Sequence, residues 1–267
     1  MEHELEIILP VRECGAALSQ TVASLLAQTD RNFAVVLADK FSRTNGNSVD
    51  ATQRQLSAGG ISTRRIKAPF QMNEIEHLNW ACARSEAAWL KPLFPGEQLK
   101  PGYTARLKQR IAARPNARII SCDWTRETEW GTETITANFS RDSLTAAEFS
   151  NYFPAGFSFF SRPINFAYHR TAWQAMGGYS TELPHYAALN LHLLLVLHYG
   201  LENLHEILAH GSPTKQCLNE SGGAKVNHWL ELWLVLKQSA IYCRAAGKPW
   251  PTKWLFVKAF TAALGRR

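Results

Sequence analysis

Two continuous apolar runs and one amphipathic segment open the chain. Residues 4–9 read as a buried strand that Pro10 ends, and residues 33–38 form a second run, FAVVLA. Between them, residues 16–27 place Leu18, Val22, Leu25 and Leu26 at helical spacing. Fully apolar strands joined through a helix are typical of a parallel sheet that is covered on both faces. The pattern therefore predicts an α/β fold with a doubly wound, mostly parallel sheet.

The rest of the chain continues this alternation. Further strands are predicted at 61–66, 89–93 and 118–123, and helices at 75–87, through Leu107 and Ile111, at 171–176 before Gly177-Gly178, at 186–199 and at 227–245. Residues 39–60 are polar and turn-rich, 125–138 suit a loop or hairpin, and the aromatic stretch 153–163 suits an ordered loop over a cleft. We expect a domain over 1–211 and a basic, Trp-rich helical extension over 212–267.

Charge is concentrated in that extension. The net charge is +7, and eight of the 29 Lys and Arg but one of the 22 acids, Glu231, lie between residues 225 and 267. The rest of the chain carries 21 basic and 21 acidic residues. Trp229, Trp233, Trp250 and Trp254 accompany the basic residues. Such a segment suits either a membrane surface with anionic headgroups or a helix that packs its tryptophans on the domain. Nothing in it matches a nucleic-acid-binding motif.

Composition favours a reduced, non-exported protein. With 267 residues and 46% hydrophobic content, the chain is large enough for a packed core. Its five cysteines are odd in number and form no C-x-x-C pair, which argues against a disulfide framework or a structural zinc site. The acidic start MEHELEIILP lacks the features of a signal peptide, and the apolar stretch 189–201 is shorter than the about 20 residues that span a bilayer. We expect a cytoplasmic protein, peripheral to the inner face of the membrane if the extension binds lipid.

Three segments carry a family resemblance. ILPVRECGAALSQTVASLLAQTDRNFAVVLADKFS resembles the opening of family 2 glycosyltransferases through Pro10, Val11, Leu18, Thr21, Ser24, Leu26, Gln28, Thr29, Phe33, Asp39 and Ser42. NWACARSEAAWLKPLFPGEQLKP, from Asn79 to Pro101, is similar to a second family segment, and YHRTAWQAMGGYSTELPHYAALNLHLLLVLHYG is similar to a third. The resemblance covers about residues 4–200. It implies the GT-A fold, which binds a nucleotide at the carboxyl ends of its first strands.

The resemblance also implies a donor site. Asp39 matches the first acid of the family's D-D-G-S turn, which contacts the nucleobase, although it could instead cap the turn after its strand. We take the nucleotide-sugar site to comprise Pro10, Val11, Arg12, Glu13, Asp39, Lys40 and Asn79. Lys40 replaces an acid there, and a fixed cation could stabilise the developing diphosphate charge, or the lysine could simply be solvated.

The departures from the family concern the chemistry. The metal-binding acids fall on Gly96 and Glu97, so Glu97 is either a surviving ligand or a surface residue in a Pro-Gly turn. No cofactor is certain, and Mn²⁺ or Mg²⁺ has weak support. The family's catalytic base falls on Ala188, which cannot titrate. His185 or Glu182 could replace it, whereas His192, on a mainly apolar helix, reads as a buried, hydrogen-bonded histidine.

Two functions follow from these substitutions. The first is an inverting, metal-independent glycosyltransferase that moves a sugar from a nucleoside diphosphate to a saccharide or lipid-linked acceptor in surface polysaccharide or glycoconjugate assembly. The second is a catalytically degenerate protein of the same fold that acts as scaffold or partner of an active enzyme. A membrane-surface saccharide-binding module is a third, weaker interpretation.

Overall fold

The structure is a computed structural model that describes residues 3–11, 15–40, 46–69, 72–137, 139–152, 157–183, 185–211, 228–245 and 247. Within these residues the strands join one sheet in the order β3-β2-β1-β4-β9-β6-β10-β5, with β7 beside β6 and β8 beside β10. The strands are β1 (Leu5–Val11), β2 (Ala34–Asp39), β3 (Ser62–Lys67), β4 (Trp89–Pro92), β5 (Gln98–Leu99), β6 (Ile119–Thr128), β7 (Gly131–Ile135), β8 (Ser143–Leu144), β9 (Phe166–His169) and β10 (Leu201–Gly211). The helices are α1 (Gly15–Leu26), α2 (Gly46–Ala58), α3 (Glu74–Cys82), α4 (Tyr103–Ala113), α5 (Ala146–Tyr152), α6 (Phe157–Phe160), α7 (Arg170–Ala175), α8 (Ala187–Tyr199) and α9 (His228–Ala245), with a short 3₁₀ turn at Pro163–Asn165.

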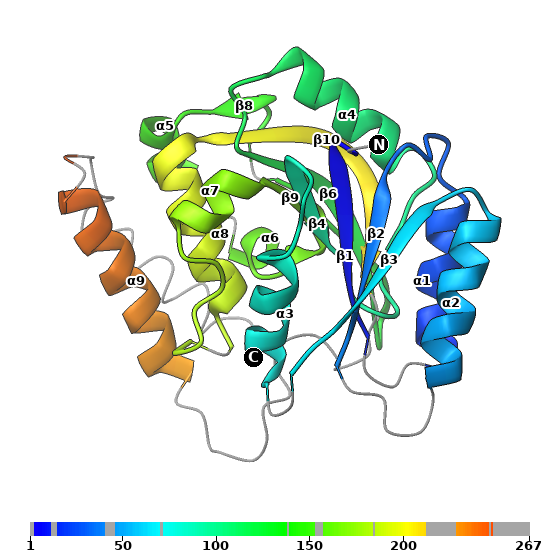
Figure 1. Ribbon diagram of the computed structural model, residues 1–267. Coiled ribbons are helices and arrows are strands. Elements are labelled where there is room, and N and C mark those ends of the chain that lie inside the picture. Colours follow the sequence, from blue (N-terminus) through cyan, green and yellow to red (C-terminus); the bar gives the residue numbers. More distant parts are fainter. Residues whose placement is uncertain are drawn as a thin grey trace.

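The long strands of the sheet are parallel. β3, β2, β1 and β4 form one parallel group, and β10 runs parallel to β6. β9 pairs antiparallel with both β4 and β6, and β5, β7 and β8 are antiparallel additions. Figure 1 shows the sheet between α1 and α2 on one side and α3, α7 and α8 on the other. The predicted α/β class, with a mostly parallel sheet covered on both faces, is confirmed.

Apolar strands form the centre of the core. Every residue of β1 and β2 is buried, as expected for strands covered on both faces. The strand predicted at 4–9 extends past Pro10 to Val11, because proline at this position still leaves a carbonyl to pair with the neighbouring strand. The predicted helices at 16–27, 171–176, 186–199 and 227–245 correspond to α1, α7, α8 and α9.

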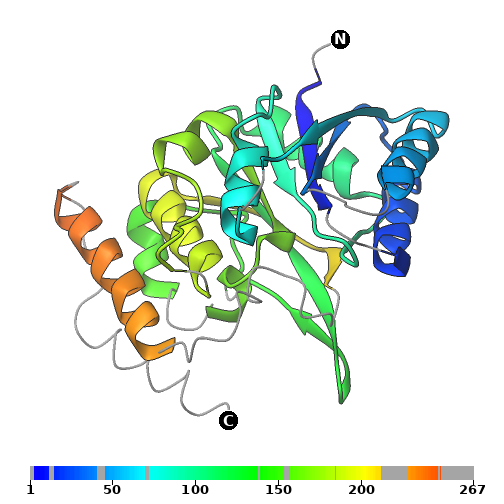
Figure 2. The ribbon, with the colours of Figure 1, turned by 60° about the horizontal axis from the view of Figure 1, so that its bottom comes forward.

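Three segments differ from the sequence-based expectation. The turn-rich stretch 39–60 contains the helix α2. Its sequence is mostly polar, and few of its apolar side chains, such as Val49 and Leu56, pack in the core, so the helical pattern is weak. The expected loop over a cleft at 153–163 contains α6, in which Phe159 and Phe160 are core residues. The strand β10 was not predicted, because polar residues interrupt it and a bulge shifts its register against β6. The expected hairpin at 125–138 is present as β6 and β7 and projects from the body in Figure 2.

Thr21 of α1 and Gln28, just after that helix, hold the chain from the turn between β4 and β5 to the start of α4. The Thr21 hydroxyl donates to the carbonyl of Glu97 at 2.7 Å and accepts from the N–H of Gly96 at 2.8 Å. The Gln28 amide donates to the carbonyl of Lys100 at 2.9 Å and accepts from the N–H of Thr104 at 3.1 Å. The first two of the three segments that carry the family resemblance are thus bonded to each other, which explains why their polar residues occur together.

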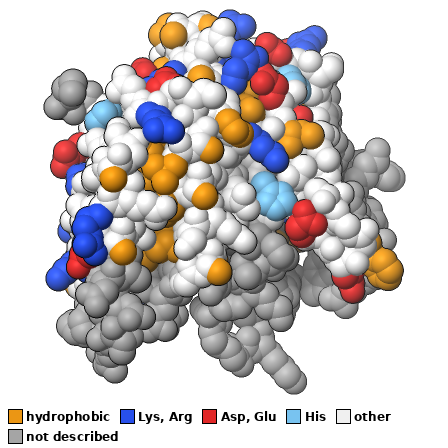
Figure 3. Space-filling view, turned by 90° about the vertical axis from the view of Figure 1, so that its right-hand side faces the viewer, with side chains coloured by type: hydrophobic (Ala, Val, Ile, Leu, Met, Phe, Trp, Pro, Cys, Tyr) orange, Lys and Arg blue, Asp and Glu red, His pale blue; other side chains and the backbone are white. Residues whose placement is uncertain are grey.

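The C-terminal helix α9 packs on α8 through Leu232, Val235 and Leu236, which are buried. Its opposite side remains exposed, and Figure 1 shows α9 at the outer edge of the molecule. None of the described helices combines the length and the apolar character needed to cross a bilayer. Figure 3 shows the α1 and α2 side of the molecule, where basic, acidic and apolar side chains of the described residues are mixed. This agrees with the equal numbers of basic and acidic residues before residue 225.

Candidate functional site

The carboxyl ends of β1 and β2 bring together four of the predicted donor-site residues. Pro10 pairs in register with Ala38 and Val11 with Asp39, and the Lys40 N–H donates to the Val11 carbonyl at 2.8 Å. Since parallel strands end at the same edge of the sheet, these residues lie where a doubly wound fold binds its ligand. Arg12 and Glu13 lie outside the described residues.

Asp39 is a buried carboxylate held by an arginine. Its side chain is 3% exposed, and Arg65 of the adjacent strand β3 hydrogen-bonds it at the end of the sheet. Arg65 also pairs with Asp50 of α2, whose side chain is 53% exposed. The hydrogen bond to Asp39, together with the nearby charge of both carboxylates, raises the pKa of Arg65 against the opposing effect of burial. Asp39 is therefore fixed in orientation by a partner that reaches it from outside the resemblance segments.

Lys40 is an ion-paired residue. Its Nζ lies 2.9 Å from Oε1 of Glu74, at the start of α3. The same helix begins with a capping box, in which Asn73 and Glu76 bond each other's backbone N–H groups. One turn further, His77 is buried, and burial lowers its pKa to about 4, so its ring is neutral at physiological pH. The charge that Lys40 brings to this edge is thus already compensated by the carboxylate of Glu74.

Asn79 bonds to a distant backbone segment. Its Nδ2 donates to the Tyr179 carbonyl at 2.7 Å, and its Oδ1 accepts from the Tyr179 N–H at 2.9 Å. This paired bond joins α3 to the residues after α7. Asn79 therefore has a structural role in addition to the donor-site role that the resemblance implies.

Glu97 is enclosed, so the alternative of a surface residue is wrong. It is 0% exposed, and its Oε2 accepts from the N–H of Phe94 at 2.9 Å, which closes the turn over Gly96 at a φ of 92°. A carboxylate inside a closed turn is poorly placed to bind a cation from solvent. In the described part of the chain, no three His, Cys, Asp or Glu side chains gather into a group able to hold a metal ion. Among the described residues, Glu97 therefore has no group of protein ligands around it with which to hold a metal ion.

The predicted replacement bases differ in their surroundings. Glu182 is exposed, whereas His185 is largely buried just before α8, on which Ala188 lies. The His185 Nδ1 is 3.0 Å from Oε1 of Glu231, and its backbone N–H donates to Oε2 of the same residue at 3.0 Å. The loop ahead of α8 is thus bonded to α9.

His192 is a core residue, as its position on an apolar helix predicted. It is 0% exposed and stacks on Phe166, with ring centroids 4.0 Å apart. Its Nδ1 contacts the Phe160 carbonyl at 2.7 Å, so this nitrogen carries the hydrogen, and Nε2 accepts from the Tyr168 hydroxyl at 2.5 Å. Burial lowers its pKa to about 3, so the ring stays neutral and plays no part in proton transfer at neutral pH.

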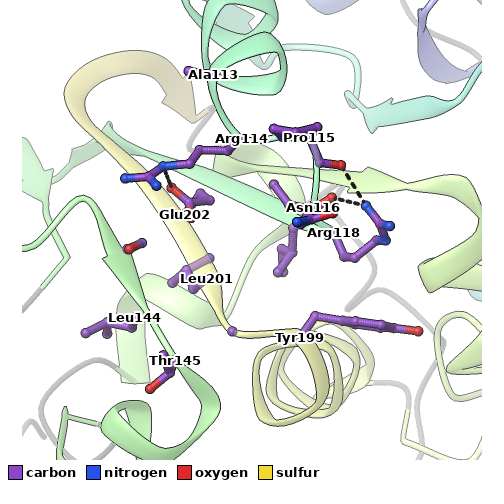
Figure 4. Close-up of a pocket in the computed structure, with 14 residues that line it drawn as sticks. Ala113, Arg114, Pro115, Asn116, Arg118, Leu144, Thr145, Tyr199, Leu201 and Glu202 are labelled. Carbon is purple, nitrogen blue, oxygen red and sulfur yellow. Dashed lines mark hydrogen bonds and ion pairs between the residues drawn. The ribbon is translucent and has the colours of Figure 1, made fainter.

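Two cavities lined by described residues lie at the other, amino edge of the sheet. One of about 330 Å³ is bounded by the starts of β6 and β10 and by the ends of α4 and α8. Figure 4 shows Arg114 reaching Glu202 there, and Arg118 turned back to the carbonyl of Pro115. A second cavity, of about 310 Å³, includes Glu6 and Arg64. Neither lies at the carboxyl ends of the parallel strands, so neither is the donor site.

Solved structures identify the fold. The chain is similar to S. aureus TarS 1-349 in complex with UDP-GlcNAc, with a TM-score of 0.70, 10% identity, and 89% of this chain and 66% of that chain covered. The complex of the same protein with UDP gives a TM-score of 0.68 and 11% identity, with 91% and 65% covered. The mannosyltransferase PcManGT from Pyrobaculum calidifontis, in complex with GDP-Man and Mn²⁺, is similar with a TM-score of 0.57 and 13% identity. The match covers 99% of this chain and 81% of that chain. The chain has a GT-A glycosyltransferase fold.

The sequence comparisons give no match. No protein-family model matches the chain, and no curated protein matches it. The chain spans 65% or 66% of the TarS 1-349 chains and 39% of the longer TarS structure. At identities of 10–13% the structural likeness establishes the fold and leaves activity open.

Sequence reasoning missed the partners of the candidate residues. Arg65 on Asp39, Glu74 on Lys40 and Glu231 on His185 all come from other elements. Of the three, Glu231 was visible in the sequence as the single acid between residues 225 and 267, a signal of burial in a pair. Arg64 and Arg65 are adjacent in the strand predicted at 61–66, so sequence spacing alone could not show which of them contacts Asp39.

Proposed function

We propose that this protein is a nucleotide-sugar-dependent glycosyltransferase of the inverting type. The observation that supports it most is Asp39, a buried and oriented carboxylate at the carboxyl end of β2 in a fold whose solved neighbours hold UDP, UDP-GlcNAc and GDP-Man. A carboxylate fixed by Arg65 can accept hydrogen bonds from the imide or amide N–H groups of a nucleobase. The donor would thus be a nucleoside diphosphate sugar.

The transfer would be a single displacement. A base takes the proton of the acceptor hydroxyl, the oxygen attacks the anomeric carbon, and the bond to the diphosphate breaks with its electron pair. His185 is the candidate base, because Ala188 at the family's position has no titratable group. Since Glu97 is enclosed and the described residues gather no metal group, we propose that the enzyme turns over without a divalent cation. The acceptor would be a saccharide or a lipid-linked saccharide in surface polysaccharide or glycoconjugate assembly.

Calorimetry tests the donor assignment. UDP, GDP, dTDP and their sugars are titrated with Mn²⁺ and again with EDTA. We expect the diphosphate of one nucleoside to bind equally well in both conditions. Asp39→Ala should raise the Kd for that nucleotide by at least about tenfold, or about 1.4 kcal/mol.

Asp50→Ala is the matched control, because Asp50 also pairs with Arg65 but sits on the exposed side of that pair. It should leave the Kd within about twofold. Wild-type affinity in Asp39→Ala would refute the nucleotide site. If no nucleotide binds, the protein is better explained as a degenerate scaffold for an active enzyme, and co-purification with such an enzyme would then be the next measurement.

The exposed side of α9 supports a membrane contact. Leu230, Trp233 and Ile241 are 52%, 51% and 58% exposed and share one stripe of the helix with Lys237 and Arg244. The Lys237 Nζ lies 4.9 Å from the centre of the Trp233 ring. We propose that this stripe binds an anionic membrane surface at the inner face of the membrane, since aromatic rings favour the interface and cations favour its headgroups. About half of the Trp233 side chain is exposed, which supports this contact over packing of its whole ring on the domain.

A further inference from the structure

His185 lies at the same edge of the sheet as Asp39. The helix α8 ends at Tyr199, and β10 begins at Leu201 beside the start of β6, which is the amino edge. A helix of 13 residues is about 20 Å long, so the beginning of α8 lies near the opposite, carboxyl edge. His185 precedes that beginning by two residues. The loop that carries it therefore reaches the edge of the sheet at which Asp39 and Lys40 lie.

Glu231 holds both the backbone and the ring of His185. Its two carboxylate oxygens divide between the backbone N–H and Nδ1, each at 3.0 Å. The side chains of His185 and Glu231 are 12% and 10% exposed, so the contact is made away from bulk water. A carboxylate that contacts two atoms of one residue restricts both the loop and the rotation of the imidazole.

The contact also selects the tautomer. An ionised carboxylate only accepts hydrogen bonds, so the nitrogen facing it, Nδ1, carries the hydrogen, and Nε2 carries the lone pair. This is the arrangement in which a carboxylate orients a histidine that acts as a general base. Glu231 comes from a helix outside the predicted catalytic domain, and the other charged residues between 225 and 267 are all Lys or Arg.

We infer that Glu231 is a positioning residue for His185, and that α9 thereby completes the catalytic site. This inference rests on the proposed function. In the transfer step the proton of the acceptor hydroxyl passes to Nε2 of His185, the freed oxygen bonds the anomeric carbon, and the diphosphate leaves with the electrons of the broken bond. Glu231 stabilises the resulting imidazolium through Nδ1 and is not itself protonated.

Steady-state kinetics on the full chain tests the inference. We expect Glu231→Gln to lower kcat by about 10- to 100-fold, with the KM of donor and acceptor within about twofold, because the lost charge acts on the transition state. Glu231→Asp should recover part of the activity. Gln238→Ala, at a half-buried position two turns further along the same helix, is the control and should keep wild-type kcat. Thermal unfolding of each variant shows whether α9 remains packed.

Nitrogen NMR of histidine-labelled protein adds a readout that does not depend on turnover. We expect the His185 resonances, assigned with His185→Gln, to show the Nδ1–H tautomer in the wild type and the Nε2–H tautomer in Glu231→Ala. Wild-type kcat in a folded Glu231→Gln, or an Nε2–H tautomer in the wild type, would overturn the positioning role alone. If the wild type transfers no sugar from any donor, the proposed function is overturned and this inference with it.

Discussion

Glu6 shows how a single buried charge is stabilised in this protein. Its carboxylate accepts hydrogen bonds from Arg64, from the Ser85 hydroxyl at 2.6 Å and from the Glu86 N–H at 2.8 Å. Burial by itself would raise its pKa, but these hydrogen bonds and the charge of Arg64 outweigh burial and lower it. The residue ties β1 to β3 and to the turn before β4, at the edge away from the donor site.

Glu6→Gln should destabilise the protein at neutral pH by about 2 kcal/mol, because the glutamine NH₂ would face Arg64 and backbone donors. A carboxyl whose pKa is lower in the folded state contributes stability above its unfolded pKa, and that contribution disappears as pH falls through the folded value. The difference from wild type should therefore shrink below about pH 4.5. Urea unfolding at pH 7 and pH 4 measures it.

Glu86→Gln is the matched control. Glu86 lies 3.9 Å from the same arginine but its side chain is 76% exposed, so its loss should cost less than about 0.5 kcal/mol. An equal effect of both variants would show that the hydrogen bonds to Glu6 contribute nothing beyond a surface ion pair.

Lys91 is another buried charge, and it too is held by other elements. It is 0% exposed, and its Nζ donates to the carbonyls of Pro92, Pro163 and Ile164. Burial lowers its pKa to about 8. Its contacts give Lys91 a structural role in joining β4 to the turn before β9.

At the level of elements, the end of α7 is fixed by what packs on it. Gly177 and Gly178 both have positive φ, 76° and 72°, as the expected glycine cap requires. A Cβ at Gly177 would meet nothing within 4 Å, whereas one at Gly178 would lie 2.6 Å from Trp173 and 2.8 Å from Oδ1 of Asn79. The second glycine is needed for the α3 contact as well as for the turn.

Gly177→Ala and Gly178→Ala form a matched pair. The first should cost about 1 kcal/mol from backbone strain, and the second about 3 kcal/mol or more, because overpacking displaces Asn79 from the backbone of Tyr179. Thermal unfolding of the two variants provides the comparison. Equal losses of stability would mean that the end of α7 can shift to accommodate the added methyl group. The hydrogen bonds between Asn79 and Tyr179 would then contribute little to stability.

At the level of the whole molecule, a balanced body carries a basic, partly exposed C-terminal helix. Binding to vesicles of phosphatidylserine and phosphatidylcholine, followed by sedimentation, tests the proposed membrane contact. We expect binding to the anionic vesicles that is lost in about 1 M salt, where the screening length falls to about 3 Å. Trp233→Ala should weaken it several-fold.

Trp130→Ala is the control for that measurement. Trp130 is 91% exposed at the turn between β6 and β7, far from α9 in Figure 2, and its loss should leave vesicle binding unchanged. Equal binding to vesicles without phosphatidylserine would contradict an electrostatic contact.

The sequence by itself determined the parallel core, because fully apolar runs such as 33–38 can be buried only inside a sheet covered on both faces. It also placed Pro10, Val11, Asp39 and Lys40 together, since the ends of neighbouring strands are fixed by the order of the elements. The tertiary structure alone decided how each candidate side chain is held. Arg65 reaches Asp39 across 26 residues, and Glu231 reaches His185 across 46. Such pairs depend on how elements far apart in the chain are brought side by side, and neither hydrophobic periodicity nor motif spacing encodes that.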